Sequence, residues 1–410
     1  MAISTDRQEP LQVIGGSIAG LMQGIMLKRL GHHVQIFERA TSNDRAEGGT
    51  GITVGPDAQR FYHQYDLLKQ SLYVDNPGIQ FMNGQGNVTR FTKRPMKMSS
   101  WSLLHFNLRA NFDGHKSSLC PDPPAPCEGD GEAIFHLGKK VIGVEYAEGD
   151  SRVAVRYQDL LQGEICTVDG DLVIVADGAS SSTRTQLLPE VKRQYAGYLA
   201  WRGYVEESRV SQETRKLLDP NFTSFSFTGG YILSYIIPSI DGSLEPGKRR
   251  INWVWYHDCP ETSPSFKESL TDAGGHVYRN YVPVGQIRAS VWKERVEMAS
   301  KILNPPFVEL VMKTAASAAA ISVIHDYASP KALFHNDKVL LVGDALALFR
   351  PHAALSFNQA AQNCLLMEDV MRKKIDLHTW EKGVTAYGNR GLAINEMLGG
   401  FMIYGTQKLS

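Results

Sequence analysis

The chain has 410 residues, in which 43 Lys and Arg balance 43 Asp and Glu, and hydrophobic residues make up 43%. A formal net charge of zero provides no overall field for binding nucleic acid or anionic lipid, so both classes of partner are disfavoured. The length favours two or three domains with ordinary globular cores.

The five cysteines give no sign of a metal site or of a disulfide framework. They form no CxxC pair, have no zinc-like spacing and are odd in number. We therefore expect free thiols, no bound metal and a reducing, cytoplasmic location. Cys120 and Cys127 flank a Pro-rich stretch, and residues 121–130 are expected to form an exposed loop. No apolar run approaches the ~20 residues that a membrane-spanning helix needs, so no transmembrane segment is predicted.

A glycine-rich turn follows the first predicted strand. Residues 11–14 are apolar and lead into Gly15-Gly16-Ser17-Ile18-Ala19-Gly20, and residues 21–30 are typical of a helix. A second strand over residues 34–37 ends at Glu38. This order of strand, turn, helix and strand is the context that dinucleotide binding requires. Glycines let the backbone approach a pyrophosphate, and the helix N-terminus offers it free N–H groups. Ser17 replaces the central glycine of the usual pattern, and a residue this small is tolerable there.

Two later strands end in an acidic residue. Residues 171–176 form an apolar run that ends in Asp177-Gly178, and residues 338–342 form another that ends in Gly343-Asp344. An acid that closes an apolar strand is poorly explained by core packing, which favours a role in binding a ligand. An NAD dehydrogenase would instead continue with further strand–helix units, so the late Gly-Asp strand disfavours that class.

In this order, the glycine-rich turn, the Asp-Gly strand and the Gly-Asp strand resemble the class A flavoprotein monooxygenases of the para-hydroxybenzoate hydroxylase type. The resemblance covers nearly the whole chain. Within the family, three stretches are similar to the 2,6-dihydroxypyridine hydroxylase branch: Gly49-Thr50-Gly51-Ile52, Tyr195-Ala196-Gly197-Tyr198-Leu199-Ala200-Trp201-Arg202-Gly203 and Arg350-Pro351-His352-Ala353-Ala354. The fold implied is α/β, with a Rossmann-like FAD-binding domain, an inserted smaller α+β substrate domain and C-terminal helices.

The resemblance also implies domain boundaries. The FAD-binding domain would be discontinuous, over residues 1–75, 100–190 and 330–375. The substrate domain would take residues 76–99 and 191–329, and residues 376–410 would form a C-terminal helical segment. Bulky residues alternate over residues 231–237 and 251–256, which suits a sheet that roofs an apolar pocket.

The residues that would bind FAD follow from the same resemblance. They are Gly15, Gly16, Ser17, Ile18, Ala19, Gly20, Glu38, Arg39, Gly51, Arg109, Val141, Asp177, Asp344, Ala354 and Asn358. Glu38 would hold the adenosine ribose, with Arg39 along the adenine side. Asp344 would accept hydrogen bonds from the ribityl hydroxyls. Asp177 would lie where FAD and a transient nicotinamide cofactor meet.

Two of these residues have a simpler alternative. Arg109 would lie near the FAD chain, or it would be a charge on the surface of a helix. The backbone of Val141 would meet the adenine, or Val141 would be an ordinary buried strand residue.

The chemistry implied is oxygenation. In the family, NAD(P)H reduces FAD, O2 forms a C4a-hydroperoxyflavin, and one oxygen atom passes to a small aromatic or N-heteroaromatic substrate, or to a polyketide- or alkaloid-like one. A base that removes a phenolic or lactam proton would activate the ring. The catalytic candidates are His352, Tyr231 and Tyr256, with His257 as a further proton-handling residue. A role in the core or in the wall of the pocket is the alternative for both tyrosines.

The segment from Pro351 to Asn358 departs from the family pattern. Ala354 and Ser356 replace glycines, and Asn363 stands where the family has an acid. A Cβ at either glycine position could crowd a backbone that approaches the flavin. This departure motivates an alternative, an FAD-binding scaffold that catalyses a non-redox rearrangement or cyclisation. A flavin-binding sensor is a third class. The substrate, the type of oxygenation, NADH or NADPH, and the oligomeric state, including a homodimer, stay open.

Overall fold

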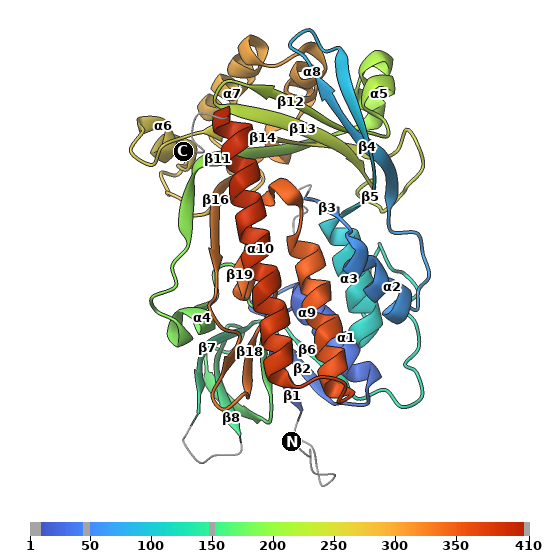
Figure 1. The fold of residues 1–410 in the computed structure, drawn as a ribbon, viewed down its shortest axis with the longest axis vertical. Coiled ribbons are helices and arrows are strands. Elements are labelled where there is room, and N and C mark those ends of the chain that lie inside the picture. Colours follow the sequence, from blue (N-terminus) through green and yellow to red (C-terminus); the bar gives the residue numbers. More distant parts are fainter. Residues whose placement is uncertain (1–9, 44–49, 147–151, 406–410) are drawn as a thin grey trace.

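The computed structural model describes residues 10–43, 50–146 and 152–405, and these form a mixed α/β protein (Figure 1). The predicted fold class is confirmed: a sheet of mostly parallel strands lies at one end and a large mixed sheet at the other. Gly49, in one of the stretches that suggested the family, lies outside the described residues.

The first sheet has six strands, and four of its five neighbouring pairs are parallel. In order, the strands are β17 (Leu333–Phe334), β18 (Val339–Leu341), β10 (Val173–Val175), β1 (Leu11–Ile14), β2 (Val34–Phe37) and β6 (Ala133–His136). All residues of β1, β10 and β18 are buried, as expected of parallel strands covered on both faces. The helices that pack here are α1 (Ile18–Arg29), α2 (Pro56–Tyr65), α3 (Trp101–Asp113) and α9 (Ser356–Met371).

A small antiparallel sheet stands beside it. Its strands are β7 (Lys139–Glu145), β8 (Val153–Asp159) and β9 (Ile165–Gly170), and the short helix α4 (Ser182–Leu187) packs on β7.

The large sheet has ten strands. In order, they are β15 (Tyr281–Val282), β16 (Ala320–Ala328), β11 (Gln194–Glu206), β14 (Arg250–Asp258), β13 (Gly230–Ile237), β12 (Phe222–Phe227), β4 (Val74–Met82), β5 (Val88–Ser100) and β3 (Gly51–Thr53), with β19 (Ala347–Leu348) paired to β16. Helices α5 (Gln212–Leu218), α6 (Pro264–Ser269), α7 (Ala289–Ile302) and α8 (Pro305–Lys313) lie in the same part of the molecule.

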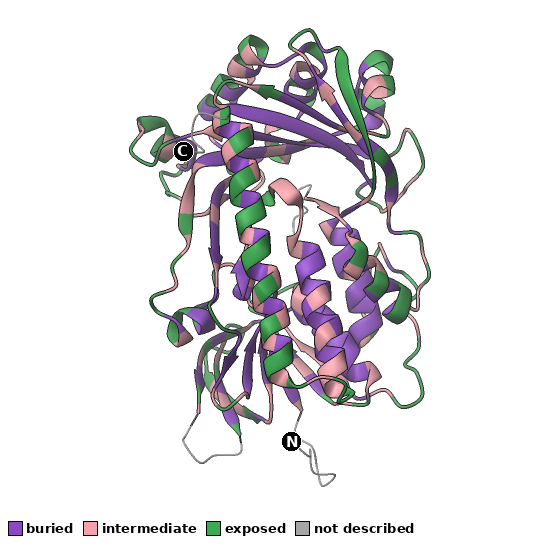
Figure 2. Ribbon diagram, in the orientation of Figure 1, coloured by how far each residue is buried: buried purple, intermediate pink, exposed green. Residues whose placement is uncertain are grey.

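The two faces of the large sheet have different environments because side chains alternate along each strand. Trp201, Trp253 and Trp255 belong to a core that includes residues of α7 and α8. Tyr198 and Tyr231 belong to the other face, which meets the part of the chain around the six-stranded sheet. Figure 2 shows that the strands of this sheet are buried along much of their length.

The predicted division into domains stays a prediction. Strands from both predicted substrate segments do lie in the large sheet. Strands β4 and β5 come from the first segment, and the strands numbered β11 through β16 come from the second. However, β3 and β19 also join it, although both lie inside the predicted FAD-binding segments. A cut at the predicted boundaries would therefore pass through a continuous hydrogen-bonded sheet.

The predicted C-terminal segment contains one long helix, α10 (Leu377–Tyr404). It runs beside α9 and continues to the large sheet, where it contacts β13, β14 and β16 (Figure 1). It therefore spans both halves of the molecule.

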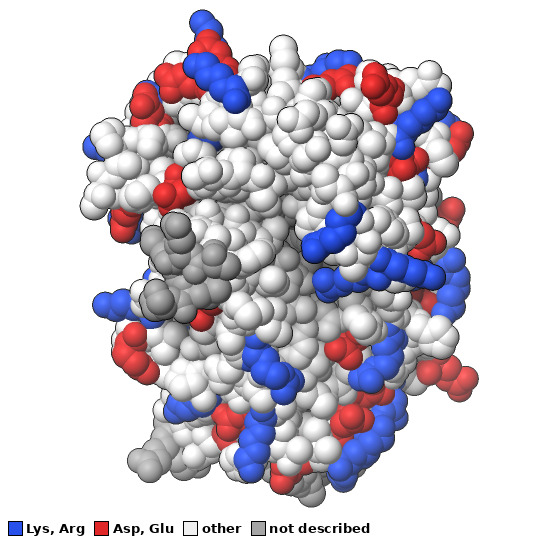
Figure 3. All heavy atoms as spheres, turned by 45° about the horizontal axis from the view of Figure 1, so that its top comes forward, with Lys and Arg blue, Asp and Glu red and all other residues white. Residues whose placement is uncertain are grey.

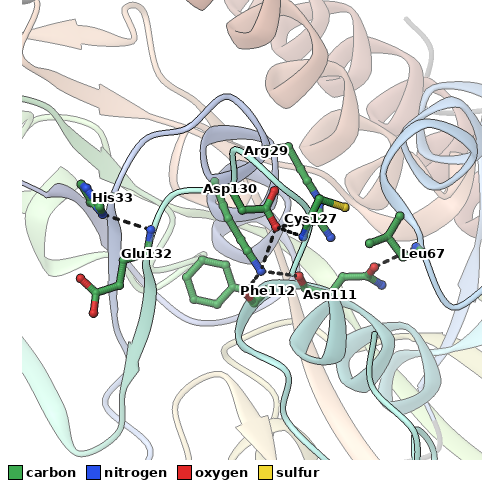
Figure 4. Close-up of polar contacts among 9 residues, drawn as sticks. Arg29, His33, Leu67, Asn111, Phe112, Cys127, Asp130 and Glu132 are labelled. Carbon is green, nitrogen blue, oxygen red and sulfur yellow. Dashed lines mark hydrogen bonds and ion pairs between the residues drawn. The ribbon is translucent and has the colours of Figure 1, made fainter. Parts of the chain in front are cut away.

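The Pro-rich loop over residues 121–130 lacks regular secondary structure but is anchored at its end. The Asp130 carboxylate pairs with Arg29 and accepts a hydrogen bond from the Cys127 amide at 2.8 Å (Figure 4). Lys28 of α1 donates to the Phe112 carbonyl at 2.8 Å, which satisfies a free carbonyl near the end of α3. All five cysteines are free. Within the described ranges, no helix has both the length and the apolarity to cross a membrane.

Candidate active site

The glycine-rich turn is packed so closely that it excludes side chains. Gly15 has a φ of +101°, and a Cβ there would lie 2.4 Å from the Ala176 carbonyl oxygen. A Cβ on Gly20 would lie 2.0 Å from the carbonyl oxygen of Gly15. Ser17 is the N-cap of α1, yet its side chain makes no capping hydrogen bond. The first turn of α1 therefore keeps amides that could bind an anion.

Glu38 connects this turn to the second strand. Its buried carboxylate accepts hydrogen bonds from the Gly16 amide at 2.9 Å and from the Ala40 amide at 2.8 Å. Arg39 is exposed next to it. The structure thus places Glu38 against the glycine turn, as a ribose-binding acid of this fold requires.

Asp177 and Asp344 lie at the same edge of the six-stranded sheet as the glycine turn, because β1, β10 and β18 are parallel neighbours. A Cβ on Gly15 would lie 2.8 Å from the Cα of Asp177, and one on Gly343 would lie 2.8 Å from the Cβ of Ala19. The carboxyl edge of an open α/β sheet is where such folds bind ligands.

Both acids are held in unusual surroundings. The Oδ1 atom of Asp177 is buried and has no hydrogen-bond partner among the described residues. Burial raises the pKa of Asp177, although Ser181 opposes the shift. Burial raises the pKa of Asp344 to about 6, against a hydrogen bond from Ser356 that lowers it. A buried carboxylate oxygen without a donor, as in Asp177, fits a ligand that brings hydroxyl groups.

Arg109 is a buried residue, so the alternative of a surface charge is wrong for it. Its guanidinium binds Asp113 and donates to Asn43 Oδ1 at 2.8 Å. It also lies 3.6 Å from the centroid of the Phe135 ring, which closes over Gly16. Arg109 therefore lies close to the glycine turn, and its contact with FAD stays a prediction.

Val141 is buried in β7 as part of the core, so its side chain has the simple structural role. The contact of its backbone with adenine also stays a prediction.

The three remaining cofactor candidates lie where the two large sheets meet. Gly51 begins β3, and a Cβ there would lie 2.3 Å from the Tyr235 ring. Asn358, in the first turn of α9, accepts a hydrogen bond from the Asp57 amide at 2.8 Å and so holds the start of α2. Ala354 has a φ of +54°, a left-handed conformation that favours glycine. Where the family pattern has glycine, this chain therefore has alanine, although the backbone there still adopts the left-handed conformation that glycine favours.

Asn363, which stands in place of the family's acid, has a structural role. Its Oδ1 accepts a hydrogen bond from the Gly343 amide at 2.9 Å and so ties α9 to the turn that carries Asp344.

The catalytic candidates form one cluster. His352 Nδ1 lies 2.5 Å from the Tyr231 hydroxyl, and Nε2 lies 2.5 Å from the hydroxyl of Tyr198. Tyr256 stacks on Tyr231 with ring centroids 4.7 Å apart. Burial, together with the positive charge of Arg350, lowers the pKa of His352 to about 3. His257 is separate: it follows Trp255 on the other face of the sheet, and burial lowers its pKa to about 4.

Two residues of this face were not assigned a role from the sequence, although both lie in the stretch 195–203. Side chains on a strand alternate between its two faces, so Tyr198 and Arg202, four residues apart on β11, lie on one face and Trp201 lies on the other. This period of two could have been recognised in the sequence. Burial raises the pKa of both Tyr235 and Tyr256, and the positive charge of the nearby Arg202 opposes each shift. Its Nε is buried without a hydrogen-bond partner, and no described carboxylate pairs with it.

The residues present fit FAD. The glycine cradle and the uncapped start of α1 suit a pyrophosphate, Glu38 suits a ribose, and the carboxylates of Asp177 and Asp344 at the sheet edge suit polyol hydroxyls. The aromatic face with Tyr231 and His352 adjoins this edge through the segment that follows Asp344.

Known proteins are similar to this chain in sequence and in fold. Residues 195–326 match the family model described as FAD binding domain-like. The chain is 26% identical over 391 residues to 2,6-dihydroxypyridine 3-monooxygenase of Paenarthrobacter nicotinovorans, which covers 93% of this chain and 87% of that protein. The solved structure of 2,6-dihydroxypyridine-3-hydroxylase from Arthrobacter nicotinovorans matches with a TM-score of 0.83 at 23% identity, over 97% of this chain and 94% of that one.

A second solved structure, Klebsiella pneumoniae HpxO complexed with FAD and uric acid, matches with a TM-score of 0.71 at 17% identity, over 97% of this chain and 90% of that one. The similarity extends over nearly the whole chain in both sequence and fold, as the order of the three motifs predicts. Over nearly its whole length the chain is therefore similar to the class A FAD-dependent aromatic monooxygenases, and it shares their fold.

Proposed function

We propose that this protein is an FAD-dependent monooxygenase that uses NAD(P)H and O2 to oxygenate a small aromatic or N-heteroaromatic compound. The observation that carries the proposal is the meeting of the glycine turn, Asp177 and Asp344 at one sheet edge, next to a tyrosine-rich face. The matched relatives are monooxygenases, which favours this function over a non-redox rearrangement.

The residues that would hold FAD come from three distant segments. The amides of the turn after β1 would bind the pyrophosphate, Glu38 the ribose and Asp344 the ribityl hydroxyls. Bound FAD supplies the electron transfer and the activation of oxygen, which no side chain of the protein can provide. The chain's own residues bind and orient the substrate, exclude water and handle its proton.

Arg202 supports a substrate with an acidic hydroxyl or lactam group. The Nε atom of Arg202 is buried without a hydrogen-bond partner, and no carboxylate among the described residues pairs with this side chain, which suits a ligand that brings negative charge. Asn252, on the same face, has a buried Oδ1 without a partner among the described residues. Together these groups could accept and donate hydrogen bonds to a hydroxylated heteroaromatic ring, the class named in the matched dihydroxypyridine enzymes.

We propose that the cluster of Tyr231, Tyr256 and His352 removes the proton of the substrate's hydroxyl or lactam group. Removal of that proton makes the ring more nucleophilic and so prepares it for oxygen transfer. Burial raises the pKa of both tyrosines, so neither is ionised at rest near neutral pH and each must pass a proton on when it receives one.

The test uses purified protein. We expect a yellow protein with bound FAD that consumes NAD(P)H and O2 when a panel of dihydroxypyridines and phenols is added, with an oxygenated product detected by mass spectrometry. A colourless protein that takes up no FAD would refute the function, and turnover without O2 would favour the rearrangement. The cytoplasmic location and the homodimer remain proposals, and sedimentation velocity tests the dimer.

A further inference from the structure

A positive charge is buried on the face of the large sheet that is turned away from Tyr231 and His352. Arg295 of α7 is only 8% exposed, and its guanidinium carbon lies 4.0 Å from the ring centroid of Trp201 and 4.8 Å from that of Trp255. Trp201 of β11 and Trp255 of β14 are directly paired across the two strands, so their side chains are neighbours on one face. The charge is therefore held over a pair of indole rings, between the sheet and α7.

The guanidinium of Arg295 is short of acceptors. Its one hydrogen bond within the described residues goes to the Met298 sulfur at 3.5 Å, and a thioether is a weak acceptor. An indole ring attracts a cation through its π face but has no lone pair for an N–H group. Most of the N–H donors of this guanidinium are therefore left without a partner in the described part of the protein.

No described acid compensates the charge of Arg295. Burial lowers the pKa of Arg295 to about 9, and the nearby Cys259 and Glu294 only oppose the shift. Glu294 is exposed on α7, and neither residue forms a hydrogen bond or an ion pair with Arg295 among the described residues. The Asp258 carboxylate accepts a hydrogen bond from the Tyr404 hydroxyl at 2.9 Å instead. An unpaired buried charge is costly, so a negative ligand would stabilise this part of the protein.

The groups around Arg295 are also donors. The Nε1 atoms of Trp201 and Trp255 are buried without a hydrogen-bond partner among the described residues, and an indole N–H can only donate. His257 follows Trp255 on the same face of β14. Burial, together with the charge of Arg295, lowers the pKa of His257 to about 4, so its ring is neutral near neutral pH. Buried donors that surround one positive charge and lack acceptors are the arrangement expected of an anion site.

We propose that Arg295, Trp201 and Trp255 form a binding site for a halide ion on this face of the large sheet, here called the Arg295 site. The inference goes beyond the proposed function and does not rest on it, because the site is separated by the sheet from the tyrosine-rich face.

The charge and the burial of the Arg295 site favour a small monovalent anion. One guanidinium brings one positive charge, so a dianion such as phosphate would leave its second charge buried and unpaired. Trp201 and Trp255 are almost completely buried, which limits the size of the ligand. Their single N–H donors and the guanidinium come from three different side chains, and a spherical ion can accept hydrogen bonds from any direction.

The Arg295 site lies directly behind residues of the candidate active site. Trp201 precedes Arg202 and Trp255 precedes Tyr256, and adjacent residues of a strand point to opposite faces of the sheet. A bound halide would therefore hold together the two strands that present Arg202 and Tyr256. We expect its effect to appear first in the stability of the protein.

The experiment measures the Tm of the purified holoenzyme while potassium chloride replaces potassium gluconate at constant ionic strength, because gluconate is too bulky for a buried site. A ligand that binds only the folded protein raises its Tm. We expect a rise of about 2 °C in the wild type and no rise in Arg295→Gln. The matched control is Lys293→Gln, which removes one positive charge from the same helix at a side chain that is 79% exposed. It should respond as the wild type does.

Three results would overturn the Arg295 site. They are a wild-type Tm that is independent of chloride, an equal rise in Arg295→Gln, and a rise with formate but not with chloride, which would identify a carboxylate ligand instead. Trp201→Phe keeps an aromatic ring under the guanidinium but removes one N–H donor, so it should need at least threefold more chloride for the same rise in Tm. This variant tests the site even where Arg295→Gln does not fold.

A second measurement needs no substitution. Crystals of the holoenzyme grown in sodium bromide should show an anomalous peak in contact with the Arg295 guanidinium, and the absence of a peak there would overturn the site. Failure of the proposed function is distinguishable, because it would show as a protein without FAD or without oxygen consumption, whatever its response to halides.

Discussion

Two acidic residues illustrate how much a single position can indicate about a binding site. Asp177 and Asp344 each follow a strand whose residues are all buried, and neither forms a salt bridge within the described part of the chain. Burial of a carboxylate without enough donors destabilises the apo-protein. A ligand whose hydroxyl groups donate to the carboxylate would offset this cost of burial when it binds. The instability of the apo-protein and its affinity for the ligand would then have the same cause.

The first prediction concerns the loss of the Asp344 carboxylate. We expect Asp344→Ala to lose bound FAD, because the acceptor for the ribityl hydroxyls disappears. The measurement is the flavin absorbance per protein after gel filtration. Asp171→Ala is the control, since Asp171 precedes the opposite end of β10. An Asp344→Ala protein as yellow as the wild type would refute the assignment.

The second prediction concerns pH. Burial raises the pKa of Asp344 to about 6, so the folded apo-protein keeps a proton that the unfolded chain has already released. The contribution of this group to stability is therefore present below its ordinary pKa of 3.8 and is lost as the pH rises through about 6. Asp344→Asn removes this dependence, so its Tm relative to the wild type should increase from pH 4 to pH 7.5. Equal differences at both pH values would contradict the shift.

At the scale of elements, α10 contributes to the site through one small residue. A Cβ on Gly399 would lie 2.7 Å from His352 Nε2 and 2.8 Å from the Tyr198 hydroxyl. Asn395, one turn earlier, accepts a hydrogen bond from the Ala353 amide at 2.7 Å. The sequence indicated a packing role for this helix, and the structure shows that the packing includes the catalytic candidates.

The third prediction compares neighbouring glycines of α10. Gly400→Ala should stabilise the protein by up to about 1 kcal/mol, because alanine favours a helix and nothing lies within 4 Å of the new Cβ. Gly399→Ala gains the same propensity but collides with His352 and Tyr198, so it should lower Tm. Thermal unfolding of the two holoenzymes checks this, and equal Tm values would show that α10 does not press on the cluster.

The whole molecule brings together segments that lie far apart in the chain. The glycine turn, Asp177 and Asp344 come from its first, middle and last parts, and α10 links the six-stranded sheet to the large one. Figure 3 shows Lys and Arg together with Asp and Glu on one face of the molecule. An anionic cofactor would therefore be held by local amides and not by an overall positive field.

The fourth prediction follows at this scale. A ligand that contacts all three segments can bind only the folded chain, so FAD should raise Tm with a dependence on its concentration. Free FAD at a hundredfold excess over Kd should add about 2.7 kcal/mol of stability. Differential scanning fluorimetry over a series of FAD concentrations measures the shift, and adenosine serves as the control for binding by the nucleoside part alone. A Tm that is independent of FAD would contradict the assembled site.

The sequence by itself was enough to predict a cofactor site, because the features on which the prediction rests are local. A tight turn needs Gly15 and Gly20 whatever surrounds it, and an acid that closes an apolar strand is visible in the strand's own pattern. It also indicated the family, from the order of three such motifs.

The tertiary structure alone decided how the aromatic face is assembled. His352 is separated from Tyr198 by 154 residues of chain and from Tyr231 by 121, and no local pattern indicates that both nitrogens of one imidazole meet a tyrosine. The burial of Arg109, the lone guanidinium of Arg202 and the contact of Gly399 likewise depend on long-range pairing. The physical reason is the distance along the chain over which each property is set. Backbone conformation and strand ends depend on neighbours in sequence. Hydrogen-bond partners and pKa values depend on distant side chains that the fold brings into the same space.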